Sequence, residues 1–134
     1  MVRLPAAEYD KLLAHAERGL PNEVCGLIAG DVRGDIKVVR RVYPLSNPDA
    51  SPVHFSVDPQ EQLAAVRDMR KNGFTPLGNF HSHPNTPARP SPEDIRLAYD
   101  PQASYLILSL AGQPALKAFH IERSRVTEES LEIV

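Results

Sequence analysis

Residues 79–94, NFHSHPNTPARPSPED, decide how this chain arranges its reactive side chains. They follow residues 74–78, FTPLG, which predict the start of a strand. Residues two apart on a strand face the same side of a sheet, so His81 and His83 direct their imidazoles the same way. Prolines at 84, 87, 90 and 92 fix the backbone φ angle and make the following loop stiff. The loop ends at residues 91–94, where a helix is expected to begin.

The residue types in this stretch suit a divalent transition metal. Ser91 is expected as the N-cap of the helix, Pro92 as its first residue, and Asp94 in its first turn. Two imidazoles and one carboxylate meet the three-ligand count of catalytic zinc sites, which leave a fourth position for water. Such a site also needs a base. Glu23 is the best candidate, because it directly precedes the apolar run 24–29, where a carboxylate is not expected without a role.

The spacing of these residues resembles the signature of the JAMM, or MPN-plus, metallopeptidases. Glu23 comes first, followed far along the chain by His81-x-His83. Seven residues separate His83 from Ser91, and two further residues separate Ser91 from Asp94. The EVCG context that begins at Glu23 is also similar to that family. The likeness extends over nearly the whole chain.

The resemblance implies a zinc peptidase or isopeptidase that acts on the C-terminal tail of a ubiquitin-like protein. It implies that one zinc ion per chain is held by three ligands, His81, His83 and Asp94. Glu23 would be the general base that deprotonates a zinc-activated water, and the Ser91 hydroxyl would stabilise the oxyanion. The likeness to small stand-alone bacterial forms implies a ubiquitin-like sulfur-carrier protein as the substrate.

Composition excludes several other classes of protein. The chain has 134 residues, a net charge of -2 and no basic block, so we expect one domain and no nucleic-acid partner. Its longest apolar runs are far shorter than the roughly 20 residues of a membrane span, and residues 1–5 do not begin a signal peptide. The single cysteine, Cys25, excludes an internal disulfide and fits a reducing cytoplasm.

Periodicity and turn residues predict a mixed arrangement of helices and strands. Glu61 is expected to complete a capping box with Asp58 at the start of the second helix. We expect one domain over residues 1–134, in which a mixed sheet has helices on its faces. The resemblance implies the same α/β class, with a JAMM/MPN fold similar to that of the cytidine deaminases. We expect helices over 5–18, 59–72 and 92–99, and strands over 24–29, 36–43, 74–83, 104–110, 116–121 and 126–134.

Each site residue also has a purely structural interpretation. A lone His-x-His is typical of an exposed strand end, but Ser91 and Asp94 at their offsets favour metal ligands. A first-turn carboxylate stabilises the helix dipole by roughly 0.3–1 kcal/mol, and it can still face a metal. Glu23 as a solvated acid at a strand start is the alternative to Glu23 as a base.

The remaining reactive side chains receive structural interpretations. Cys25 is expected to be a small buried residue, because an apolar strand is a poor setting for a thiolate nucleophile. His15 is expected to be solvated, and Glu93 to be exposed and directed away from Asp94. His54 either lines a cleft or lies on the surface.

Other functional classes stay open or are excluded by missing residues. A non-catalytic MPN-type scaffold for protein binding, and a deubiquitinase-like isopeptidase that cuts protein conjugates, remain alternatives. Zinc deaminases need His-x-Glu and Pro-Cys-x-x-Cys, which a chain with one cysteine does not have. Zincins need His-Glu-x-x-His, which is also absent.

Overall fold

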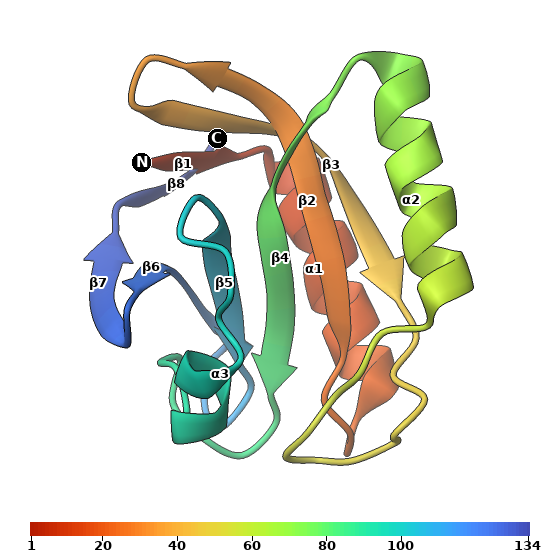
Figure 1. The fold of residues 1–134 in the computed structure, drawn as a ribbon. Helices are drawn as coiled ribbons and strands as arrows, with labels where there is room; N and C mark the ends of the chain where they lie inside the picture. The colour runs from red at the N-terminus through yellow and green to blue at the C-terminus, as the bar shows by residue number, and fades with distance from the viewer.

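Eight strands form one mixed sheet with helices on its faces, as expected (Figure 1). The computed structural model describes residues 1–134. The strands are β1 (Val2–Leu4), β2 (Cys25–Arg33), β3 (Ile36–Leu45), β4 (Thr75–His83), β5 (Ser104–Ser109), β6 (Ala115–Glu122), β7 (Arg125–Glu129) and β8 (Leu131–Ile133). The helices are α1 (Ala6–Gly19), α2 (Pro59–Asn72) and α3 (Pro92–Arg96). Along the sheet the strands follow the order β7-β6-β5-β4-β2-β3-β1-β8.

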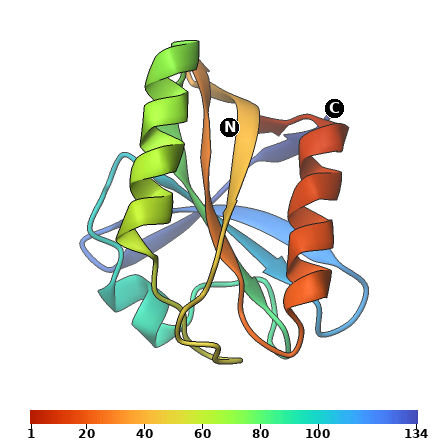
Figure 2. The ribbon, with the colours of Figure 1, turned by 90° about the vertical axis from the view of Figure 1, so that its right-hand side faces the viewer.

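Helices α1 and α2 cover opposite faces of the sheet (Figure 2). The α1 side chains Leu12 and Ala16 are fully buried in the largest apolar cluster. On the other face, Ala65 and Met69 of α2 pack against Ala29 of β2. Helix α3 lies on the same side as α2, below it in Figure 2. Helix α3 therefore lies on the face of the sheet opposite α1.

Strand β4 lies in the middle of the sheet and carries the two histidines at its end. It pairs antiparallel with β2, where His81 is opposite Cys25, and parallel with β5, where His83 is opposite Ser109. Because β2 begins where β4 ends, Glu23 stands immediately beside the end of β4. The sheet register thus brings together residues that are almost 60 positions apart, since Val24 and Ser82 contact one another at a sequence separation of 58.

The C-terminal segment forms two strands in place of the single strand predicted over 126–134. Only Ser130 separates β7 from β8, yet these strands lie at opposite edges of the sheet order. The sheet must therefore curl so that its two edges approach. Strand β8 pairs with β1, which the sequence analysis missed because a three-residue strand is too short to show a period. Both apolar side chains of β1, Val2 and Leu4, are fully buried.

Two predicted helix features are wrong. Helix α3 ends at Arg96 and not at residue 99. Glu61 does not complete a capping box, because its carboxylate accepts hydrogen bonds from the backbone N–H and the hydroxyl of Ser46. Asp58 does cap α2, by accepting from the N–H of Gln60. No helix of the structure combines the length and the apolar character that crossing a membrane requires.

We predict that Gly78→Ala destabilises the protein. A Cβ at this position would lie 1.9 Å from the carbonyl oxygen of Ser104 on β5, and the backbone φ angle is +154°. Because the clash is with backbone, relief requires β4 and β5 to separate, and overpacking of this kind costs about 1–3 kcal/mol. Urea unfolding measures the loss. Gly112→Ala is the control, because its Cβ would meet nothing within 4 Å. Equal stability of the two variants would contradict the prediction.

Candidate active site

Three predicted residues converge at the end of β4. His81 Nε2, His83 Nε2 and Asp94 Oδ2 form a triangle in which every side is 3.1 Å. The two histidines are buried, and the side chain of Asp94 is 14% exposed. His81 and His83 come from the same face of one strand, and Asp94 comes from the first turn of α3. The sequence prediction that these three side chains meet is therefore correct in its geometry.

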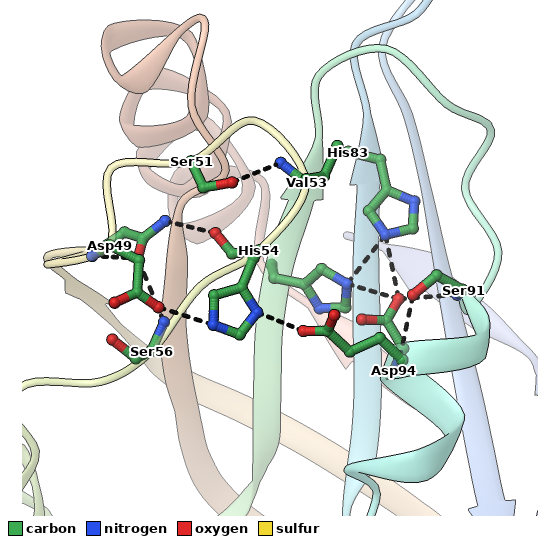
Figure 3. Close-up of polar contacts among 11 residues, drawn as sticks. Asp49, Ser51, Val53, His54, Ser56, His83, Ser91 and Asp94 are labelled. Carbon is green, nitrogen blue, oxygen red and sulfur yellow. Dashed lines mark hydrogen bonds and ion pairs between the residues drawn. The ribbon is translucent and has the colours of Figure 1, made fainter.

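A reciprocal capping box fixes the carboxylate of Asp94. Ser91 is the N-cap of α3, and its hydroxyl oxygen accepts a hydrogen bond of 3.0 Å from the Asp94 N–H. In return, the Ser91 N–H donates to Asp94 Oδ2 at 2.9 Å. Figure 3 shows Ser91 beside Asp94, with His83 directed toward the same carboxylate. Because the Ser91 hydroxyl caps the helix through a lone pair, its own proton stays free to be donated.

Each imidazole ring has one contact that fixes its orientation. The Nδ1–H of His83 donates to the carbonyl oxygen of Pro87 at 2.9 Å, so in the neutral ring Nε2 presents a bare lone pair. The stiff proline loop thereby sets the tautomer of this histidine. The ring of Phe55 stacks on His81 with centroids 5.0 Å apart. His81 Nδ1 is buried without a hydrogen-bond partner.

The three facing atoms fit a metal cation. Three lone-pair donors that lie 3.1 Å apart repel one another unless protons or a cation lie between them. Ligand atoms around a tetrahedral zinc ion are about 3.3 Å apart at the usual bond lengths of about 2.0–2.1 Å. Two imidazoles and one carboxylate are also a donor set that zinc accepts. Thus the site could hold one zinc ion.

Hydrogen bonds within this triangle shift the pKa values of Asp94 and His83. Burial would raise the pKa of Asp94, but hydrogen bonds from His81 and His83 outweigh it and hold the pKa far below its usual range. Burial would lower the pKa of His83, but its bonds to Asp94 and the Pro87 carbonyl raise the pKa overall. The Asp94 carboxylate therefore stays ionised at neutral pH, as a metal ligand must.

Glu23 lies next to this group, two residues before the first residue of β2. Its side chain is buried, with 6% of the residue exposed, and no residue donates a hydrogen bond to its carboxylate. Desolvation by burial raises the pKa of Glu23 from 4.5 to about 7, while positive charge on His83 opposes this shift and Asp94 adds to it. A carboxyl group with a pKa near 7 can both accept and release a proton at neutral pH.

A cleft of about 260 Å³ opens beside the side chains of His81 and Asp94. Phe55, Leu97 and Tyr105 are among the residues that line it. Phe55 belongs to the loop between β3 and α2, and Leu97 follows the end of α3.

A bond between His54 and Glu93 joins the loop before α2 to helix α3. His54 Nδ1 is bonded to the Glu93 carboxylate, and His54 Nε2 is 2.8 Å from Asp49 Oδ2. The bond with Glu93, followed by the nearby carboxylates, raises the pKa of His54 despite some desolvation. The expectation that Glu93 points away from Asp94 is wrong, because Glu93 lines the same cleft. His54 itself is not among the residues that line the cleft, and its side chain is 43% exposed, so it lies at the surface and reaches the cleft only through its bond with Glu93.

The prediction for Cys25 is confirmed, and the prediction for His15 is wrong. Cys25 is buried, with 1% exposed, and burial raises the pKa of its thiol to about 12, which excludes it as a nucleophile at neutral pH. His15 is not simply solvated. Its Nε2 lies 3.2 Å from the Cys25 carbonyl oxygen and 3.0 Å from that of Leu45, so α1 is tied to both β2 and β3.

Sequence reasoning missed Asn47, which organises the loop between β3 and α2. Its Nδ2 donates to the carbonyl oxygens of Glu23 and His54, at 3.1 and 2.9 Å. Its Oδ1 accepts from the N–H groups of Asp49 and Ser56. One side chain thus connects the backbone of Glu23 to the cleft wall. The only signal in the sequence was an asparagine before Pro48, which is ordinary for a turn.

The fold is a mixed α/β sheet, and its site places two imidazoles and a carboxylate beside a cleft. Together they describe an α/β protein of the class that can hold a metal ion. The family model "Prokaryotic homologs of the JAB domain" matches residues 5–123. The chain therefore belongs to the JAB-domain family, as the motif resemblance predicted.

Individual relatives cover most of the chain. The CysO-cysteine peptidase of Mycobacterium tuberculosis is 35% identical over 127 residues, which are 93% of this chain and 86% of that protein. A desampylase of Haloferax volcanii is 36% identical over 115 residues, 82% of this chain and 81% of that protein. The solution structure of a protein from Desulfitobacterium hafniense matches with a TM-score of 0.92 at 57% identity, over 100% of this chain and 93% of the other.

We predict that Glu23→Gln changes the pH dependence of stability in the chelated protein. The folded-state pKa of Glu23 lies above its unfolded value of 4.5, so the wild type loses stability as pH rises from about 4.5 to about 7. Glutamine has no such loss. The unfolding free energy of the variant relative to wild type should therefore increase by up to about 3 kcal/mol over this window. Urea unfolding at several pH values measures it, and a difference that stays constant with pH would contradict the assigned pKa.

Proposed function

We propose that residues 1–134 form one zinc-dependent peptidase domain, which hydrolyses an amide bond at the C-terminal tail of a ubiquitin-like, sulfur-carrier-type protein. The observation that carries this proposal is the triangle of His81, His83 and Asp94 with a carboxyl group of raised pKa, Glu23, beside it. A scaffold that only binds proteins would need neither the donor triangle nor a buried acid tuned to neutral pH.

Each residue of the site has a separate role in the proposed reaction. His81, His83 and Asp94 would hold the zinc ion, which when bound lowers the pKa of water from about 15.7 toward about 7. Glu23 accepts the proton of the attacking water and then donates it to the leaving amine. The Ser91 hydroxyl donates a hydrogen bond to the oxyanion that develops on the carbonyl. Phe55 and the apolar wall of the cleft limit the access of bulk water.

The substrate follows from the shape of the cleft and from the relatives. A cleft of about 260 Å³ that Phe55 and Leu97 line suits a tail of small residues, such as the Gly-Gly ends of ubiquitin-like proteins. A relative named CysO-cysteine peptidase, aligned over 93% of this chain, supports the release of a cysteine from such a tail. Desampylases among the relatives support a second candidate, the cleavage of isopeptide bonds in conjugates, by the same residues.

An intact-mass experiment tests the proposal. The purified chain is incubated with zinc and a ubiquitin-like sulfur-carrier protein that bears one additional C-terminal cysteine. We expect the mass of the carrier to fall by one cysteine residue, and a chelator to prevent this. Glu23→Gln should retain zinc and lose turnover, while Glu128→Gln, an exposed glutamate on β7, should behave as wild type. An unchanged carrier mass, or full cleavage in chelator, would refute the proposal.

We predict that Ser91→Ala lowers the rate without releasing zinc. Loss of one oxyanion donor typically costs on the order of 10²–10³ in kcat. The same change removes the N-cap of α3, which costs about 1 kcal/mol of stability. Ser91→Gly separates the two effects, because glycine also lacks the hydroxyl donor but costs only about a few tenths of a kcal/mol at an N-cap. Wild-type kcat in the alanine variant would remove Ser91 from the mechanism.

A further inference from the structure

Ser82 lies between His81 and His83 on β4, but its side chain belongs to the opposite face of the sheet. It is 1% exposed. We propose that Ser82 is a positioning residue for the reaction: its hydroxyl anchors the backbone next to Glu23 and so fixes where the Glu23 carboxylate stands relative to the two imidazoles. This inference rests on the proposed role of Glu23 as the base.

Two hydrogen bonds join Ser82 to Val24, the residue that follows Glu23. The Val24 N–H donates to Ser82 Oγ at 2.9 Å, and this bond is buried. The Ser82 N–H donates to the Val24 carbonyl oxygen at 3.0 Å. The regular ladder between β2 and β4 begins one pair further in, at Cys25 and His81. The Ser82 hydroxyl therefore supplies an acceptor just beyond the end of the ladder, where Val24 would otherwise have a buried and unpaired N–H.

Backbone anchors matter more for Glu23 than for an ordinary catalytic acid. No residue donates a hydrogen bond to its carboxylate, so no side-chain contact of that kind sets its direction. The backbone of Glu23 is held on its outer side by the loop, through its N–H to the Ser51 carbonyl at 2.8 Å and its C=O to Asn47 Nδ2 at 3.1 Å. Ser82 is the anchor on the sheet side. It is also the only one attached directly to the strand that bears both histidines.

Loss of the Ser82 hydroxyl should therefore affect the rate more than the metal site. His81 and His83 are positioned by β4, Phe55 and the Pro87 carbonyl, none of which depends on the hydroxyl. The start of β2 would be free to move away from β4 and carry Glu23 with it. A displacement of about 1 Å in a catalytic group can cost on the order of 10²-fold in rate.

Ser82→Ala and two companion variants test this role. For Ser82→Ala we expect kcat to fall on the order of 10- to 100-fold, with little change in KM or bound zinc. The Val24 amide should exchange with solvent faster than in wild type. Ser82→Thr, which keeps the hydroxyl, should restore kcat and amide protection. Ser104→Ala removes another fully buried strand hydroxyl, bonded to Glu129, and should lower stability while keeping wild-type kcat.

The outcomes separate this inference from the proposed function. Faster exchange at Val24 with unchanged kcat in Ser82→Ala would overturn the positioning role and leave the peptidase intact. Loss of zinc in Ser82→Ala would also overturn it, because the hydroxyl would then act through the ligands. If the wild type and all variants fail to cleave the carrier, both the proposed function and this role are wrong.

Discussion

The antiparallel pairing of β2 with β4 is the constraint on which the site depends. It places Cys25 opposite His81, and so brings the start of β2, with Glu23, beside the end of β4, with both histidines. A shift of the register by one residue would turn His81 and His83 toward the α1 core and expose Phe80 in their place. The buried side chains of Phe80 and Ile28 oppose such a shift, because each belongs to the main apolar cluster.

A second constraint is the double use of Asp94. The oxygen that accepts the Ser91 N–H in the capping box is the same oxygen that faces both imidazoles. Helix α3 has only five residues, so its first turn is most of the helix. The cap therefore supports this short helix, and at the same time it fixes the carboxylate that faces both imidazoles. The proline loop joins β4 to this helix and contributes the Pro87 carbonyl that orients His83.

The sequence predicted the parts of the molecule that follow from local chemistry. Ser91 as N-cap, Pro92 at the first helical position and the same-face histidines each follow from rules that act over a few residues. The fold class followed from the order of the elements, and the family from the motif. Features set by distant contacts were not predictable. Glu61 has the spacing of a capping box but bonds Ser46, β1 gains its place only by pairing with β3 and β8, and the bond between Ser82 and Val24 spans 58 positions.

One metal ion should bind where the three donors meet, within reach of Glu23. Crystals grown with zinc and examined by anomalous diffraction at the zinc edge test this directly. We predict one strong peak per chain, at about 2.0–2.2 Å from His81 Nε2, His83 Nε2 and an oxygen of Asp94. The Glu23 carboxylate should lie at hydrogen-bond distance from the solvent that completes the site. A peak elsewhere, or a peak with Asp94 turned away from it, would contradict the account.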